Sequence, residues 1–99
     1  MEHMADLLSE QQISDALTKL PHWQHKGSTL ERTVELASFP QAIQVVNRVA
    51  EIAESVNHHP DIDIRWRKLT FQLSTHSEGG ITEKDVSLAE QIDGVIDAL

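Results

Sequence analysis

Cysteine is absent from the 99-residue sequence. A disulfide framework, a thiolate nucleophile and a cysteine-ligated zinc or iron–sulfur site are therefore excluded. The sequence consequently puts no constraint on the redox state of the compartment in which the protein works.

Basic residues are also scarce, because eight Lys and Arg stand against 16 Asp and Glu and give a formal net charge of −8. Such a charge repels nucleic-acid phosphates and anionic membrane surfaces. No hydrophobic run approaches the roughly 20 residues of a membrane span, and the N-terminus lacks the basic stretch and apolar core of a signal peptide. We therefore expect a cytoplasmic protein that binds neither a membrane nor, directly, nucleic acid.

The chain is long enough for one hydrophobic core and too short for two. With 39% hydrophobic and 24% charged residues, it has the composition of an ordinary globular protein. We expect a single domain over residues 1–99, of which residues 1–8 are flexible.

Three segments carry the sequence signals of helices. Ser9 and Gln12 form a capping-box pattern that predicts a helix over residues 9–20, which Pro21 ends. A serine cap followed by proline predicts a second helix over residues 38–56. A threonine cap with an acid three residues later predicts a third helix over residues 82–99.

Alternation of apolar and polar residues predicts two β-hairpins. Leu30, Val34 and Leu36 alternate with polar residues after a turn signal at residues 26–28. The second hairpin is expected to have strands near 62–67 and 69–75.

The predicted order is α-β-β-α-β-β-α, which favours an α+β fold of two layers: a four-stranded antiparallel sheet with three helices on one face. The other face is then uncovered, and an open apolar face or edge on so small a domain favours self-association. Ala42, Val45 and Ile52 widen the apolar stripe of the second helix beyond one sheet face, so they belong either to the core or to a contact with another subunit.

Histidines are the residues most suited to chemistry here. His58, His59 and His76 fall in two predicted loops, and Pro60 stiffens the first of them. Exposed loop histidines without a role are one interpretation. General acid–base catalysis is a second, because imidazole titrates near neutrality. A zinc site with Glu54 or Asp85 is a third, although adjacent residues point apart and no His-x-x-x-His spacing occurs.

Other residues near these loops have both a functional and a structural interpretation. Glu54 stands one helical turn before His58 and could orient it, or could simply be a solvated glutamate. Asp85 is explained mainly as a helix cap. Trp66 could stack on a planar heterocycle, although strand aromatics are more often part of the core. The hydroxyls of Ser74 and Thr75 could bind a polar ring edge.

Taken together, these positions resemble the signature of the pterin-4a-carbinolamine dehydratases. The resemblance extends over nearly the whole chain, and its typed positions at fixed gaps are Glu54, His58, His59, Pro60, Trp66, His76 and Asp85. It implies removal of water from 4a-hydroxytetrahydropterin to give quinonoid dihydropterin, which regenerates the tetrahydrobiopterin cofactor of aromatic amino acid hydroxylases. The pterin is the substrate, and neither a metal nor another cofactor is implied.

The resemblance also implies roles for individual residues. His58 and His76 would act as acid–base groups, His59 would bind the pterin and share proton transfer, and Glu54 would orient a histidine. The pocket would be lined by Asn57, Pro60, Trp66, Ser74, Thr75 and Ser77, while Asp85 would be a structural member of the signature. Asn57 and Ser77 stand where animal members tend to carry acids. The family forms homodimers and homotetramers, and a non-catalytic assembly or transcriptional coactivator module is the alternative function.

Overall fold

The computed structural model describes residues 6–99, and its elements follow the predicted order. They are α1 (Glu10–Leu17), β1 (Gln24–Lys26), β2 (Thr29–Glu35), α2 (Phe39–Val56), β3 (Asp61–Arg65), β4 (Lys68–Leu73), the short 3₁₀ helix η1 (His76–Glu78) and α3 (Glu83–Asp97). The flexible segment predicted at residues 1–8 lies mostly outside the described residues. No helix within residues 6–99 is long and apolar enough to cross a membrane.

Side-chain caps begin all three α-helices, as the sequence predicts. Ser9 caps α1 and Ser38 caps α2, each by accepting a hydrogen bond from the backbone N–H three residues on. Thr82 caps α3, and Asp85 completes its capping box by accepting from the backbone N–H of Thr82. These caps satisfy N–H groups that have no partner inside the helix.

Helix α1 is shorter than predicted, since it ends at Leu17 and not at residue 20. The next three residues form i→i+3 backbone bonds, from Thr18 to Asp15, Lys19 to Ala16 and Leu20 to Leu17. Pro21 disfavours helical geometry at Leu20, so the last turn tightens and does not continue the α-helix. Leu20 still reaches the core, where it is buried.

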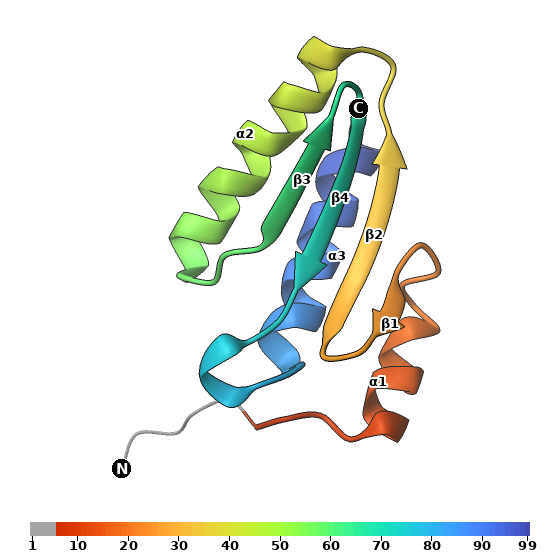
Figure 1. Ribbon diagram of the computed structural model, residues 1–99, viewed down its shortest axis with the longest axis vertical. Helices are drawn as coiled ribbons and strands as arrows, with labels where there is room; N and C mark the ends of the chain where they lie inside the picture. Colours follow the sequence, from red (N-terminus) through yellow and green to blue (C-terminus); the bar gives the residue numbers. More distant parts are fainter. Residues whose placement is uncertain (1–5) are drawn as a thin grey trace.

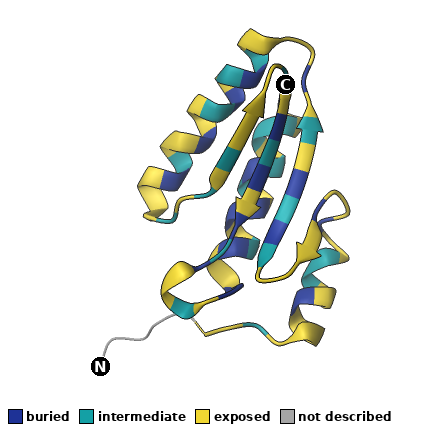
Figure 2. Ribbon diagram, viewed as in Figure 1, coloured by how far each residue is buried: buried dark blue, intermediate teal, exposed yellow. Residues whose placement is uncertain are grey.

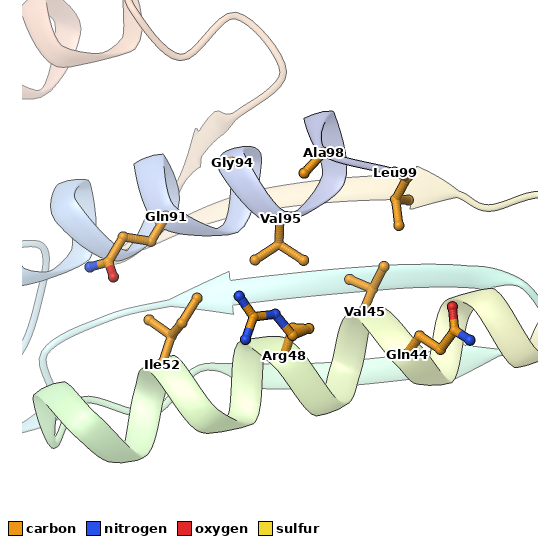
Figure 3. A pocket seen from close by; sticks show the side chains of 9 residues that line it. All are labelled: Gln44, Val45, Arg48, Ile52, Gln91, Gly94, Val95, Ala98 and Leu99. Carbon is orange, nitrogen blue, oxygen red and sulfur yellow. The ribbon is translucent and has the colours of Figure 1, made fainter.

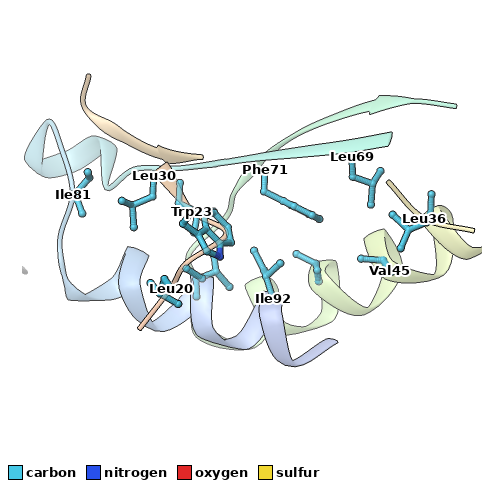
Figure 4. Packing of buried hydrophobic residues seen from close by; sticks show 14 of the residues in the cluster. Leu20, Trp23, Leu30, Leu36, Val45, Leu69, Phe71, Ile81 and Ile92 are labelled. Carbon is cyan, nitrogen blue, oxygen red and sulfur yellow. The ribbon is translucent and has the colours of Figure 1, made fainter. Parts of the chain in front are cut away.

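The four strands form one antiparallel sheet in the order β1-β2-β4-β3 (Figure 1). Helices α2 and α3 lie against one face of it, and the buried side chains of the central strand β4 point toward them (Figure 4). Leu69, Phe71 and Leu73 are fully buried there, with Val49 and Ile92 from the two helices. This single core confirms the predicted two-layer α+β fold.

The other face of the sheet is uncovered, as predicted (Figure 2), but the residues on it are polar. Successive side chains of a strand alternate between faces. Opposite the core, Thr33, Thr70 and Asp63 therefore form one cross-strand row, and the side chains of Thr33 and Thr70 hydrogen-bond at 2.9 Å. The expectation of an open apolar face is wrong, because every apolar strand position is used on the helical side.

The broad apolar stripe of α2 divides between core and surface. Ala42 and Val45 are buried in the core, whereas Ile52 is only half-buried. Ile52 and Val45 of α2 face Val95 of α3 and the C-terminal Leu99 across a groove of about 460 Å³ on the helical side of the molecule (Figure 3).

Candidate active site

The backbone turns sharply where α2 ends, and this turn positions the two adjacent histidines. Asn57 adopts a left-handed conformation with φ 53°, which asparagine tolerates better than most residues. The N–H of His58 then donates to the carbonyl of Ala53 at 3.0 Å. Pro60 keeps His59 out of helical geometry. As a result the His58 side chain is only 11% exposed, while that of His59 is 56% exposed.

The second loop connects β4 to α3 and carries His76. A pair of backbone hydrogen bonds closes it, with the N–H of Thr75 donating to Gly80 at 2.8 Å and the N–H of Gly80 donating back at 3.4 Å. Between these residues, η1 starts at His76, which is exposed. Gly79 has φ 73°, a conformation that favours glycine.

Asp85 joins the two loops. Its carboxylate is fully buried, and its Oδ1 lies 2.6 Å from Nε2 of His58. Its Oδ2 accepts from the Thr75 hydroxyl at 2.8 Å and from the Thr82 N–H at 2.9 Å. Thr75 directly precedes His76, so one carboxylate fixes the loop of His58 and the start of the loop of His76.

The hydrogen bonds around Asp85 have one consistent direction. Because the Thr75 hydroxyl donates to Asp85, it accepts from the Thr82 hydroxyl, which lies 2.7 Å away. The Thr82 oxygen in turn accepts from the N–H of Lys84 at 3.2 Å. Thr75, Thr82 and Asp85 are all buried, and a buried polar network is stabilising when each member has a partner.

This network also assigns the protons of His58. An ionised carboxylate can only accept hydrogen bonds, so the nitrogen facing Asp85, Nε2, carries a proton. In the neutral imidazole the other nitrogen, Nδ1, then holds the lone pair. His58 is thus held in the tautomer that can take up a proton at Nδ1, and its protonated form can return that proton.

Glu54 contacts a different histidine from the one predicted. Its Oε1 lies 3.3 Å from Nε2 of His59, and the expected contact with His58 is wrong. The left-handed turn at Asn57 rotates His58 inward to Asp85 and leaves His59 on the side of Glu54. Both members of the Glu54–His59 pair are exposed, at 82% and 56%.

Comparison with known proteins identifies the family to which this chain belongs. A family profile described as pterin 4 alpha carbinolamine dehydratase matches residues 6–95. The chain belongs to the pterin-4a-carbinolamine dehydratase family. The match includes both histidine loops and Asp85, and it confirms the resemblance inferred from the signature residues.

Relatives named for the same family resemble the chain over most of its length. One from Nocardia farcinica is 59% identical over 88 residues, which is 89% of this chain and 93% of that protein. Another from Mycobacteroides abscessus is 60% identical over 87 residues, which is 88% of this chain and 93% of that protein.

Two solved structures share the fold. A Brucella melitensis protein described as a transcriptional coactivator/pterin dehydratase matches with a TM-score of 0.88 and 28% identity, covering 91% of this chain and 98% of its own. A pterin dehydratase-like RuBisCO assembly factor of the alpha-carboxysome matches with a TM-score of 0.61 and 20% identity, covering 74% and 84%. The second likeness shows the fold alone.

The residues that the resemblance assigns to the pocket lie in different parts of the structure and differ in exposure. Asn57 and Ser77 are exposed and Pro60 is half-buried, each beside a predicted catalytic histidine in sequence. Ser74 is half-buried just after β4. Trp66 is not brought to them within the chain, because it lies in the β3–β4 turn, at the end of β3 away from His59 (Figure 1).

Trp66 is 71% exposed, has φ 57° and stacks on Arg67, whose guanidinium lies 5.0 Å from the ring centroid. We expect Trp66→Gly to change the free energy of unfolding by less than about 1 kcal/mol, because relief of the positive φ offsets the lost stacking. Phe71→Ala, in the core, should cost about 3–5 kcal/mol. Urea denaturation of the two variants checks this difference, and an equally large loss in Trp66→Gly would contradict the placement.

Sequence reasoning missed a cleft of about 270 Å³ beside His58. It is lined by Val56 at the end of α2, by His58 in the loop that follows, and by Lys84, Ser87 and Gln91 on one side of α3, among others. The spacing of three and four residues between Lys84, Ser87 and Gln91 indicates that they share one face of a helix. The sequence alone does not show that this face lies beside His58. Within residues 6–99, no group of three His, Asp or Glu side chains could hold a metal ion.

Proposed function

We propose that this protein is a 4a-hydroxytetrahydrobiopterin dehydratase that uses histidine acid–base catalysis. The reaction breaks the bond between C4a and its hydroxyl group, and the hydroxyl leaves as water after receiving a proton. A ring nitrogen gives up a proton, and its electron pair forms the new double bond of the quinonoid dihydropterin. Atoms and charge balance without a metal, an oxidant or another cofactor.

The Asp85 junction carries this proposal. It ties the loop that carries His58 to the residue immediately before His76, which supports the proposal that groups from the two loops act together. A dehydration needs one group that gives a proton and one that takes a proton, and two imidazoles in different protonation states meet that need. His58 is held for proton uptake at Nδ1, while the exposed His76 is open to substrate.

We assign the remaining roles by position. His59 binds the pterin and shares in proton transfer, and Glu54 orients its imidazole through the 3.3 Å contact. Asn57 and Pro60 from the first loop, with Ser74, Thr75 and Ser77 from the second, line the pocket through backbone or side-chain groups. Trp66 of the same chain lies outside this set.

The decay of 4a-hydroxytetrahydropterin, followed by stopped-flow absorbance, tests the proposal. The intact protein should accelerate this decay, and an excess of EDTA should leave the acceleration unchanged. A decay rate that is the same with and without the protein would reject the proposed activity.

We expect Glu54→Gln to reduce kcat/KM by roughly tenfold at most, because Glu54 acts only through the exposed His59. Its free energy of unfolding should change by less than about 1 kcal/mol, as for other exposed ion pairs. Steady-state kinetics and urea denaturation measure the two effects. Glu51→Gln, on the same helix and away from both loops, is the matched control, and a loss as large in this variant would contradict the role of Glu54.

We further propose that the reaction recycles tetrahydrobiopterin in the cytoplasm for an aromatic amino acid hydroxylase. The support is the family itself, whose substrate is the carbinolamine that such hydroxylases release. Coupled hydroxylation assays provide the test: the protein should sustain turnover when the pterin is catalytic in amount. If the hydroxylase formed the same total amount of product with and without the protein, this role would be contradicted.

A homo-oligomer is proposed from the groove between α2 and α3, which apolar Ile52, Val95 and Leu99 line together with polar residues (Figure 3). Sedimentation equilibrium should show a dimer or tetramer, and Val95→Glu should shift it toward monomer. The same groove would serve a non-catalytic assembly or coactivator module. That alternative predicts a protein partner in pull-downs that persists in His59→Ala, in a protein without dehydratase activity.

A further inference from the structure

A short segment before α1 lies against the loop that carries His76. The segment comprises Asp6, Leu7 and Leu8, and we refer to it as the N-terminal strap. It starts beside the loop and leads away from it to α1 (Figure 1). The N–H of Leu8 donates to the carbonyl of Ile81 at 2.9 Å, so the strap is bonded to the chain just after the loop closes.

Gly80 gives the second contact. A Cβ atom at this position would lie 3.1 Å from Cδ2 of Leu7, closer than ordinary van der Waals contact. Gly80 is buried, and its φ lies outside the left-handed region, so its lack of a side chain matters for space. The Leu7 side chain occupies the place that a side chain at position 80 would take.

The two sides of the loop are therefore held differently. Its inner side is fixed by two buried hydrogen bonds of the Thr75 hydroxyl, which donates to Asp85 and accepts from Thr82. Its outer side has the backbone pair between Thr75 and Gly80, and the Leu7 side chain lies against Gly80. His76 to Glu78 form a 3₁₀ turn between these fixed points, in which His76 and Ser77 are exposed and Glu78 is half-buried.

We propose that Leu7 and Leu8 are positioning residues for His76. The strap shields the Thr75–Gly80 backbone bonds from water and restricts the width of the loop, which keeps the His76 imidazole in one place. This inference rests on the proposed function for its catalytic consequence, but the structural restraint does not depend on any activity. A misplacement of an acid–base group by about 1 Å can cost a factor of 10² in rate.

A double-mutant cycle of Leu7→Ala and Gly80→Ala tests the restraint. We measure amide hydrogen exchange of Thr75 and Gly80 and the imidazole NMR signals of His76, none of which requires substrate. Leu7→Ala should speed exchange of both amides by roughly tenfold and shift the His76 signals. Gly80→Ala should do the same by displacing Leu7, and the double variant should be no worse than either single variant because both remove the same contact.

Leu7→Met should restore exchange to within about twofold of the native rate, since methionine keeps the volume. Leu99→Ala is the matched control, because Leu99 is 57% exposed, close to the 54% of Leu7, and lies on the α2–α3 groove. Exchange rates and His76 signals that are unchanged in Leu7→Ala, or that change equally in Leu99→Ala, would overturn the proposal.

The kinetic consequence is measured separately. If the protein is a dehydratase, Leu7→Ala should lower kcat by roughly tenfold with a smaller change in KM, because a displaced His76 weakens proton transfer more than binding. An unchanged kcat alongside faster exchange would reject the catalytic part. Native protein without dehydratase activity would reject the proposed function. The structural restraint by the strap would then be tested by amide hydrogen exchange alone.

Discussion

His58→Gln is expected to lower the protein-dependent decay of 4a-hydroxytetrahydropterin by about 10²–10⁴-fold, the usual contribution of a general acid or base. Glutamine retains an N–H donor for Oδ1 of Asp85, so the buried carboxylate keeps a partner, but it cannot carry a proton between substrate and solvent. The stability should therefore fall much less than the rate. Stopped-flow absorbance and urea denaturation measure the two quantities on the same preparation.

His25→Gln is the matched control, because His25 is exposed on β1 and belongs to neither loop. It should keep both the native rate and the native stability. A His58→Gln protein with more than about a tenth of the native rate would show that His58 is not an acid–base group. The tautomer assigned from Asp85 would then have no catalytic meaning.

Asp85→Ala is expected to lower the free energy of unfolding by about 3–5 kcal/mol, because its removal leaves several buried polar groups without a partner. The groups affected are the Thr82 N–H, the Thr75 hydroxyl and Nε2 of His58. For a small domain whose total stability is about 5–15 kcal/mol, such a loss takes the protein near its unfolding threshold. Urea denaturation followed by tryptophan fluorescence gives the value.

Asp85→Asn separates the structural role of Asp85 from its role toward His58. Asparagine keeps the size of the side chain and one acceptor oxygen, so its stability cost should be smaller, about 1–3 kcal/mol. It cannot satisfy all three donors, and the tautomer of His58 is no longer fixed by a carboxylate. We expect a fall in kcat by a factor of about 10² or more in protein that is still folded.

Asp97→Asn removes the same charge at the opposite end of α3, where Asp97 is exposed. It should leave activity unchanged and stability the same or slightly higher, since a negative charge near a helix C-terminus is unfavourable. If Asp85→Asn were as active as Asp97→Asn, Asp85 would be a helix cap and nothing more.

Most of the fold could be predicted because its signals are local. The caps at Ser9, Ser38 and Thr82 and the alternation along β4 are each readable within a few residues. The errors arose where a tertiary or steric effect decides the outcome. Pro21 disfavours helical geometry in the residue before it, and α1 therefore ends earlier than its apolar pattern predicts. The strand register shows which residues share the outer face of the sheet, and these residues are polar.

The candidate site was harder, because its contacts join residues distant in the sequence. The signature residues pointed to His58, His59 and His76, but helical spacing paired Glu54 with the wrong histidine. That spacing assumes that the helix continues, and the left-handed Asn57 ends it. Asp85 looked sufficient as a cap, and its contacts with His58 and Thr75 cross separations of 27 and 10 residues that no local pattern reveals.

The most direct test of the central claim is imidazole NMR of the native protein titrated with a stable oxidised pterin. We predict that the side-chain signals of His58, His59 and His76 all shift together as the pterin binds, while those of His22 and His25 do not. Shifts confined to the histidines of one loop, or spread equally to His22 and His25, would contradict a single site built from both loops around one pterin ring.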